Sequence, residues 1–234
     1  MAYVEHYEAE NLDKLSAKSY LCDDCNKATC DLTLSIGLGN FVKQIAERHN
    51  LPVQLNAIVT NIEVPIDRND PICITTQDNH RYFSEYVLIT IPLGCLKASS
   101  IQFTPPLPDW KHKAIETMGF GLLNKIYMQF PLTFWDESLE NIFVASNQFC
   151  FFQCYSNDHI LIAFVCGYLA SQLEQLTDDE IINKTLQRLQ SIYPNIPKPS
   201  KWLITRWGSD PFSYGSYSHF KVGAMYETSK EEAE

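Results

Sequence analysis

Hydrophobic and polar residues alternate most clearly over residues 119–130, GFGLLNKIYMQF, and this alternation predicts a β-strand. The two faces of the strand carry different residues: Ile126, Met128 and Phe130 on one, and Leu123, Lys125 and Tyr127 on the other. Lys125 is therefore a single ammonium among large side chains. Because burial of an unpaired ammonium is costly, an inward-facing Lys125 would be deprotonated, paired, or set against a polar cavity or cofactor. The alternative is an edge-strand lysine whose ammonium reaches water.

The first hundred residues are predicted to contain one short helix and several short strands. Residues 1–20 resemble the end of a helix followed by a loop. Asn40 is expected to cap a helix that ends near Asn50, with these residues on its buried side: Phe41, Val42, Ile45 and Ala46. An antiparallel meander should follow, in this order: a strand over 53–62, a turn at 67–71, a strand over 72–76, a turn at 77–79 and a hairpin return.

Residues 86–91 form a continuous apolar run that Pro92 ends. Such a run is typical of a strand buried on both faces of an α/β sheet. Beyond a proline-rich segment at 103–108, Asp109 is predicted to open a helix that Gly119 closes.

The last hundred residues favour a sheet with a covering helix. Strands are expected over 149–155 and 160–168, joined by a turn at 156–158, and a last strand over 202–207. Thr177 and Glu180 form a capping box for a helix that ends before Pro194 and whose apolar side is made of these residues: Ile181, Ile182, Leu186, Leu189 and Ile192.

The composition supports a packed core and argues against two classes of partner. The 234 residues are 45% hydrophobic and 12% aromatic, enough for one large or two small domains. A net charge of −10 without any basic run makes direct nucleic-acid binding unlikely and favours cationic partners. No apolar run reaches the roughly 18 residues that span a bilayer. The first ten residues show no signal peptide, so we expect an intracellular protein in the cytoplasm, peroxisome or nucleus.

The eight cysteines are expected to be reduced. Cys22, Cys25 and Cys30 have the spacing C-x2-C-x4-C, and His6 or His49 would be needed to complete a zinc site. A second Cys-x-x-Cys or spaced Cys-x-x-His pair is missing from the sequence, so no metal site is predicted.

Five motifs occur in a fixed order along the chain: PLGCLK at 92–97, IQFTPPLPDWKHKAI at 101–115, GFGLLNK at 119–125, FWD at 134–136 and RWGSDPFSYGSYS at 206–218. Taken together, from about Gly37 to Gly223, they resemble the flavin-containing amine oxidase family. That family includes polyamine oxidases, monoamine oxidases and lysine-specific histone demethylases.

The resemblance implies a mixed α+β and α/β fold, made of part of an FAD-binding domain and a substrate domain. The substrate domain should hold a mixed, largely antiparallel sheet flanked by helices. The implied divisions are these: 1–28, the end of a helical segment of the substrate domain; 29–96, the middle of the FAD domain; 97–210, the substrate domain; and 211–234, the start of the return to the FAD domain.

The resemblance also implies a chemistry. The lysine matching Lys125 holds a water against flavin N5, beside the C–N bond of a small cationic amine such as a polyamine. Hydride passes from the amine α-carbon to FAD, the imine is hydrolysed, and hydrogen peroxide is released. A lysine that holds and polarises a water suits this role.

Other site residues follow from the same resemblance. Tyr217 matches a wall of the substrate cage, and Trp207 and Phe212 match positions close to the flavin. Val59 matches a backbone contact with the FAD adenine, and Thr90 and Pro92 are expected at a strand end facing the dinucleotide. From the residues alone, the aromatic cluster that includes Tyr214 fits either amine binding or core packing.

One element of such a flavoprotein is missing from the sequence. There is no Gly-x-Gly-x-x-Gly turn to approach a pyrophosphate, and Gly37-Leu38-Gly39 lacks the third glycine. We therefore expect a partial enzyme that lacks both ends of the family's chain. Two alternatives stay open: a histone demethylase-like oxidase, disfavoured because Phe212 replaces the tryptophan of those proteins, and a non-catalytic binding module.

Overall fold

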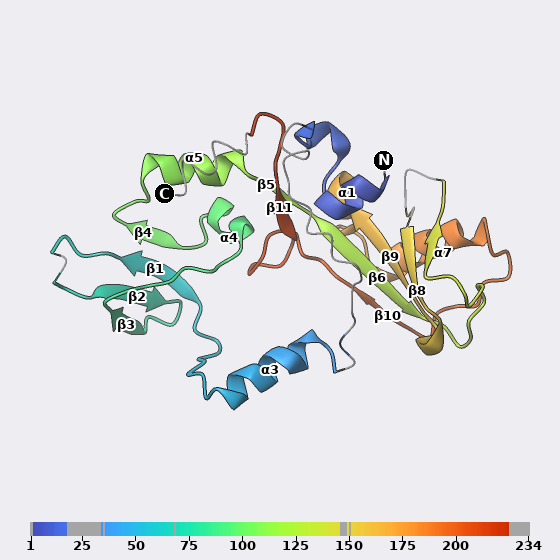
Figure 1. Cartoon of the computed structure of the whole chain (residues 1–234), viewed down its shortest axis with the longest axis horizontal. Helices are drawn as coiled ribbons and strands as arrows, with labels where there is room; N and C mark the ends of the chain where they lie inside the picture. The colour runs from blue at the N-terminus through green and yellow to red at the C-terminus, as the bar shows by residue number, and fades with distance from the viewer. Residues whose placement is uncertain are drawn as a thin grey trace. The chain divides into compact units, whose positions relative to one another are not determined.

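The computed structural model describes residues 2–17, 34, 36–67, 69–145, 149 and 151–224 (Figure 1). The protein has a mixed α/β fold with three sheets. The chain divides into two compact units. The first unit comprises Met1–Leu21, Ile89–Ser100 and Pro108–Glu234, and the second comprises Cys22–Leu88 and Ile101–Leu107.

The second unit contains a four-stranded sheet in the order β3-β2-β1-β4. Its strands are β1 (Val59–Glu63), β2 (Ile72–Thr76), β3 (Arg81–Ser84) and β4 (Gln102–Thr104). The pairs β1–β2 and β2–β3 are antiparallel, which confirms the predicted meander, whereas β4 joins β1 in parallel. Ile62, Cys73 and Thr76 are buried in this sheet. The strand predicted over 53–62 is shorter than expected, since β1 begins at Val59 and the preceding apolar residues are exposed.

Helix α3 (Leu38–Arg48) of the same unit confirms the predicted helix but corrects two of its details. Gly37, with φ of 74°, occupies the N-cap position, while Asn40 donates its side-chain amide to the Ile36 carbonyl at 2.8 Å. No residue of α3 is buried, and Phe41 and Val42 are 42% and 57% exposed. Periodicity identifies the apolar side of a helix, but burial also requires a partner, and no described element supplies one.

The buried strand predicted over 86–91 is wrong. These residues form no strand, and Tyr86 and Leu88 are 85% and 89% exposed. A strand needs a hydrogen-bonded neighbour, and none of the described strands pairs with this run. Pro92 instead takes the N-cap position of α4 (Leu93–Lys97), in the first unit.

The first unit is built on a five-stranded antiparallel sheet in the order β10-β6-β9-β8-β7. Its strands are β6 (Leu123–Gln129), β7 (Asn141–Phe143), β8 (Phe151–Tyr155), β9 (Ile160–Cys166) and β10 (Lys201–Ile204). The predicted hairpin is confirmed as β8 and β9, joined by the 3-10 turn η2 (Ser156–Asp158). The predicted last strand is shorter, because β10 ends three residues before Trp207.

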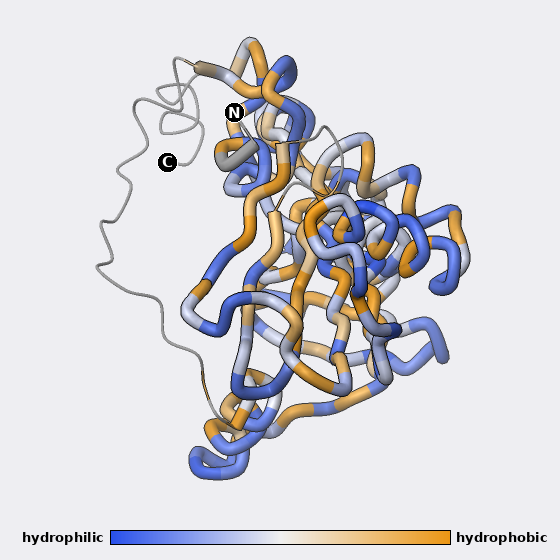
Figure 2. Tube along the Cα trace, turned by 90° about the vertical axis from the view of Figure 1, so that its right-hand side faces the viewer, coloured by the Kyte–Doolittle hydropathy of each residue, from blue (hydrophilic) through white to orange (hydrophobic). Residues whose placement is uncertain are grey.

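One face of this sheet packs against α6 (Gly167–Leu173) and α7 (Asp178–Gln190). The core between them is made of aliphatic and aromatic side chains, among them Ile126, Met128, Phe130, Phe152, Leu161, Ala163, Val165, Ile181 and Leu189. Hydrophobic residues alternate with hydrophilic ones along much of the trace, as Figure 2 shows. The capping box of Thr177 and Glu180 is confirmed, but Ile192 lies beyond α7 and is 41% exposed.

A second, two-stranded sheet of this unit pairs β5 (Gly119–Gly121) with β11 (Tyr217–His219). The predicted strand over 119–130 is thus two strands, β5 and β6, which separate at Leu122. Helix α5 (Asp109–Thr117) precedes β5, and α1 (Ala2–Glu8) and the 3-10 turn η1 (Leu12–Lys14) form the start of the unit. Among the described residues, no helix combines the length and apolar character needed to cross a lipid bilayer.

Candidate functional site

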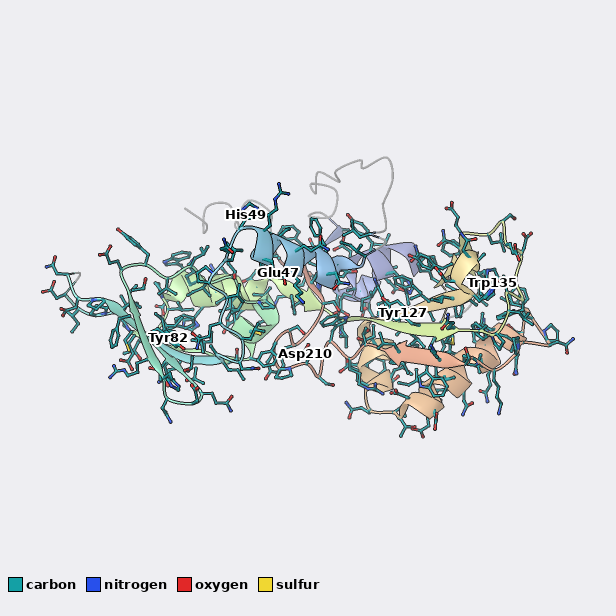
Figure 3. All side chains as sticks on the ribbon, turned by 90° about the horizontal axis from the view of Figure 1, so that it is seen from below. Glu47, His49, Tyr82, Tyr127, Trp135 and Asp210 are labelled. Carbon is teal, nitrogen blue, oxygen red and sulfur yellow. The ribbon has the colours of Figure 1, made fainter. Side chains whose placement is uncertain are left out.

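Lys125 lies on an inner strand of the five-stranded sheet. Strand β6 is paired with β10 on one side and with β9 on the other, so the edge-strand alternative is wrong. The predicted alternation is confirmed: Ile126 and Met128 are fully buried on the core face, while Lys125 and Tyr127 are half-buried on the opposite face. Tyr127 is labelled on this strand in Figure 3. The ammonium of Lys125 therefore belongs to the face that α6 and α7 do not cover.

A row of aromatic side chains crosses the sheet and ends at Lys125. Lys125 is opposite Phe164 of β9, which is opposite Phe151 of β8, which is opposite Phe143 of β7. The Lys125 Nζ lies 5.2 Å from the centroid of the Phe164 ring. The rings of Phe164 and Phe151 are 4.9 Å apart, and those of Phe151 and Phe143 are stacked at 5.0 Å. A lysine over an aromatic face is a cation–π contact.

We did not predict this aromatic row from the sequence. Each phenylalanine is recognisable as one position of an apolar strand, but the row exists only in the antiparallel register of β7, β8 and β9. The available signal was the short hairpin turn between β8 and β9, which sets the register of these two strands.

Helix α1 packs beside this row through His6. The ring of His6 lies edge-on to Phe151 at 5.9 Å, and its Nε2 is 3.2 Å from the Phe164 carbonyl oxygen. The hydroxyl of Tyr217, on β11, donates to the His6 carbonyl at 2.7 Å. Burial, helped by nearby Cys166 and Glu8, raises the pKa of Tyr217 to about 12. The Tyr217 hydroxyl is therefore protonated near neutral pH, as a hydrogen-bond donor must be.

The segment 205–217 carries the predicted aromatic cluster, and it is tied to β6 at both ends. At its start, Trp207 donates its backbone N–H to the Asn124 side chain at 3.0 Å. At its end, the Ser216 hydroxyl accepts the Leu123 N–H at 2.8 Å and donates to the Leu123 carbonyl at 3.0 Å. Asp210, labelled in Figure 3, closes the turn between them, because its carboxylate accepts the backbone N–H of residue 212 at 2.8 Å.

The four aromatic residues of this segment are not packed into the core. Trp207 and Tyr214 are each 42% exposed, Tyr217 is 37% exposed and Phe212 is 61% exposed. The core-packing alternative is therefore wrong for the described residues. Exposed aromatic side chains on a hydrogen-bonded loop are typical of a binding surface.

The remaining predicted residues belong to different units of the structure. Val59 is half-buried at the start of β1, in the second unit, whereas Thr90 and Pro92 belong to the first. The prediction that Thr90 and Pro92 lie at a strand end is wrong, since neither is in a strand and both are exposed. Pro92 nonetheless begins α4, whose Cys95 thiol donates to the Pro211 carbonyl at 3.9 Å. Helix α4 thus contacts the segment that carries the aromatic cluster.

No group of three or more His, Cys, Asp or Glu side chains among the described residues is arranged to hold a metal ion. Cys22, Cys25 and Cys30, the cysteines weighed for a zinc site, lie outside the described residues.

Comparison with known proteins gives one family and one fold. The family described as "Flavin containing amine oxidoreductase" matches residues 3–232. Lysine-specific histone demethylase 1 homolog 3 of Arabidopsis thaliana is 34% identical over 208 residues, which cover 82% of this chain and 13% of that protein. Polyamine oxidase 5 of Oryza sativa subsp. japonica is 33% identical over 226 residues, covering 94% and 44% respectively.

Among solved structures, putrescine oxidase bound to putrescine shares the fold, with a TM-score of 0.67 and 24% identity. The match covers 80% of this chain and 42% of that one. The chain thus spans less than half the length of each of these relatives.

Proposed function

The chain belongs to the flavin-containing amine oxidoreductase family, and from this premise we propose that it forms the amine-binding part of an FAD-dependent amine oxidase. The observation that carries the proposal is the position of Lys125: an ammonium on an inner strand, beside Phe164 and on the face away from the core. Desolvation of a half-buried ammonium on an inner strand is unfavourable unless the ammonium faces a polar site. In this proposal residues 97–210 form the substrate domain, and residues 29–96 belong to the FAD domain.

The chemistry of the exposed residues fits one end of FAD. The aromatic surfaces of Trp207, Phe212 and Tyr217 suit a flat ring system and the apolar flanks of an amine. The pyrophosphate end has no counterpart in the sequence, which contains no Gly-x-Gly-x-x-Gly turn. We therefore assign the ring and amine side of the site to this chain. As the resemblance implies, we propose Val59 as a backbone contact of the FAD adenine, and Thr90 and Pro92 as residues that face the dinucleotide.

When bound, FAD supplies the acceptor for a hydride from the amine α-carbon, and molecular oxygen reoxidises it to give hydrogen peroxide. The residues of this chain do the rest. Lys125 has three N–H donors, which can hold a water beside the imine carbon. That water adds to the carbon, and the C–N bond breaks to give a carbonyl compound and the shortened amine. The exposed aromatic rings of the segment 205–217 hold the amine through their faces.

We propose a polyamine or a related secondary amine as the substrate. The net charge of −10 favours a polycation, and a polyamine oxidase is among the relatives that cover most of this chain. The second candidate is a methylated lysine side chain, favoured by the identity with histone demethylases. Against it, the resemblance implies that Phe212 matches a position where the demethylases have tryptophan.

The test replaces Lys125 in the flavin-loaded protein that contains this chain. Lys125→Met should leave the flavin content unchanged and lower oxidase turnover by a factor on the order of 10² or more, the usual contribution of a positioned acid–base group. Lys201→Met is the matched control, since Lys201 is exposed on the neighbouring strand β10. Undiminished turnover in Lys125→Met would overturn the role of Lys125. Spermidine and a dimethyl-lysine peptide, offered in parallel, distinguish the two substrates.

The visible spectrum of the purified chain tests the non-catalytic alternative. Because the phosphate-binding turn is missing, we expect the chain alone to bind FAD poorly. Flavin absorbance near one equivalent would exclude a binding module that works without cofactor.

A further inference from the structure

Asn124 precedes Lys125 on β6 and points to the opposite face, where it is only 2% exposed. A buried amide needs partners for its donor and acceptor atoms. The Nδ2 of Asn124 donates to the Glu174 carboxylate at 2.7 Å. Its Oδ1 accepts the Thr205 hydroxyl at 3.1 Å and the backbone N–H of Trp207 at 3.0 Å. One side chain therefore joins α6 and β6 to the start of the aromatic segment.

Thr205 extends this network to the backbone of Lys125. Its hydroxyl accepts the Lys125 N–H at 2.8 Å, and its own N–H donates to the Lys125 carbonyl at 3.0 Å. Thr205 thus forms hydrogen bonds with both the N–H and the carbonyl of Lys125, and its hydroxyl also donates a hydrogen bond to Asn124. Thr205 therefore couples the side chain of Asn124 to the backbone of Lys125.

Glu174 completes the network at the C-terminal end of α6. Its Oε1 also accepts the Gly208 N–H at 2.8 Å, and its Oε2 accepts the Ser209 hydroxyl. Gly208 permits this approach, because a Cβ at that position would lie 2.9 Å from Oε2. Three donors converge on one carboxylate, and hydrogen bonds to a charged acceptor are among the stronger ones in proteins.

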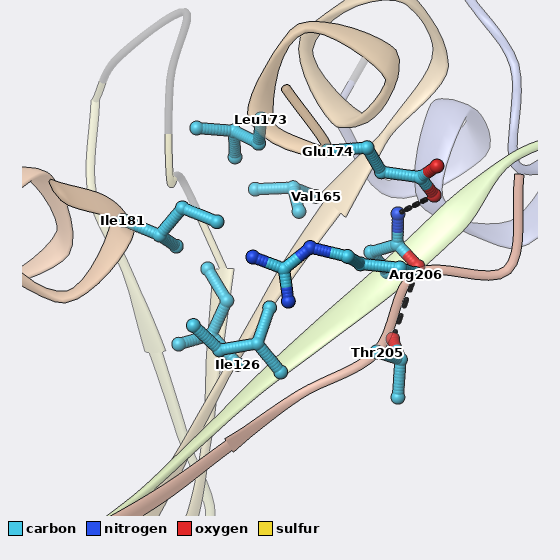
Figure 4. Close-up of a pocket in the computed structure, with 9 residues that line it drawn as sticks. Ile126, Val165, Leu173, Glu174, Ile181, Thr205 and Arg206 are labelled. Atoms are coloured by element: carbon cyan, nitrogen blue, oxygen red, sulfur yellow. Dashed lines mark hydrogen bonds between the residues drawn. The ribbon is translucent and has the colours of Figure 1, made fainter. Parts of the chain in front are cut away.

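The network itself leaves no room for a ligand. The cavity that it shares with Ile126, Val165 and Ile181 is about 10 Å³, about the space of one water (Figure 4). Asn124 and Glu174 therefore act on the site only through the groups they hold, which are the backbone of Lys125 and residues 205–209.

We propose that Asn124 and Glu174 are a positioning pair, which fixes the aromatic segment against the strand of Lys125 for amine oxidation. The role in oxidation rests on the proposed function, whereas the mechanical coupling does not. The pair sets the distance between the ammonium on one face of β6 and the rings that follow Thr205.

The test exchanges donor and acceptor within the pair. Asn124→Asp keeps the shape of the side chain but places a carboxylate against Glu174. Hydrogen exchange of the amides at 205–209 should become about 10- to 100-fold faster, as expected for loss of a charge-assisted bond. The amides of β8 should be unchanged. Adding Glu174→Gln to Asn124→Asp restores a donor opposite an acceptor at residue 124, and exchange at 205–207 should return to within a few-fold of the original. The Gly208 amide should stay fast, because the amide nitrogen of residue 174 then replaces the oxygen that accepts it.

Gln175→Glu is the control for added charge, because residue 175 is exposed and next to Glu174. It should leave exchange at 205–209 unchanged. If Asn124→Asp does not fold, Glu174→Gln alone should give a smaller increase in the same segment. Unchanged exchange in Asn124→Asp, or no recovery in the double variant, would overturn the coupling.

A second readout separates positioning from a purely structural role. In the flavin-loaded protein, the rate at which saturating spermidine bleaches the flavin absorbance should fall in Asn124→Asp and recover in the double variant. An unchanged rate alongside accelerated exchange would show that the pair only stabilises the loop. If the longer protein that contains this chain holds no flavin, that result would count against the proposed function, and hydrogen exchange would still decide the coupling.

Discussion

Gly119→Ala should destabilise the first unit because His219 occupies the space of the missing side chain. The two residues face each other in the β5–β11 pair. A Cβ on residue 119 would lie 2.1 Å from Nε2 of His219 and 2.4 Å from its Cδ2. His219 is 5% exposed, so its ring must be displaced from its buried position to admit the added methyl group. Gly119 is not among the glycines with positive φ, so the cost of alanine is steric.

The expected loss is about 1–3 kcal/mol, the usual cost of overpacking a filled interior. With a urea m-value of about 2 kcal/mol/M, the unfolding midpoint should fall by roughly 0.5–1.5 M. Equilibrium urea unfolding followed by circular dichroism measures this change. The same perturbation should loosen Tyr217, two residues from His219 on the strand that pairs with β5.

A double-mutant cycle identifies the cause. His219→Ala removes the ring, so Gly119→Ala should cost little in that background, with a coupling energy of about 1–3 kcal/mol. Gly39→Ala is the control, because no atom lies within 4 Å of a Cβ there and the residue is helical. It should be neutral or stabilise by up to about 1 kcal/mol. A Gly119→Ala loss below about 0.5 kcal/mol, or strictly additive changes in the cycle, would refute the steric explanation.

Three further predictions use the same unfolding assay. Thr177→Ala removes the capping box of α7 and should cost about 1 kcal/mol; no change would show that the cap is dispensable. Phe152→Ala, at a fully buried core position, should cost about 3–5 kcal/mol. Phe143 is 64% exposed on the paired strand β7, so Phe143→Ala should cost far less. Equal losses of stability in Phe152→Ala and Phe143→Ala would contradict the assignment of Phe152 to the core face and Phe143 to the opposite face. Burial, assisted by lysines 14, 97 and 221 and opposed by Glu10, lowers the pKa of His219 below its ordinary 6.5. The unfolded chain therefore binds a proton at His219 more readily than the folded chain does. The contribution of His219 to stability is complete above pH 6.5 and declines as the pH falls towards the folded-state pKa. His219→Ala should flatten that slope below pH 6.5, and an unaltered slope would show that other groups cause it.

The elements that could be predicted from the sequence are those whose signals are local. Alternation identified β6, a capping box identified α7, and apolar runs around a short turn identified β8 and β9. The expected burials that failed concern partners that are distant in sequence. The apolar side of α3 and the run over 86–91 were expected to be buried, yet no described element covers either one.

The site residues also differ in whether their sequence signal is local or depends on distant partners. Lys125 stood out because it interrupts an apolar strand, and no distant residue was needed to notice it. Phe164 and Phe151 become its neighbours only through the register of three strands, which alternation alone does not determine. Asn124 gave no sequence signal, since a polar residue beside a lysine resembles ordinary strand surface. Its burial is apparent only once Glu174 and Thr205 are placed around it.

The period of two residues along β6 links the site to the core. Asn124 and Ile126 face the helices, while Lys125 and Tyr127 face the aromatic row, so adjacent residues serve opposite faces. A slip of one residue would place Lys125 in the core and Asn124 over Phe164, and it would lose the burial of Ile126 and Met128. Burying an aliphatic side chain of this size is worth about 1.5–3 kcal/mol, so such a slip is strongly disfavoured. The position of Lys125 is therefore maintained by the packing free energy of the face that it does not touch.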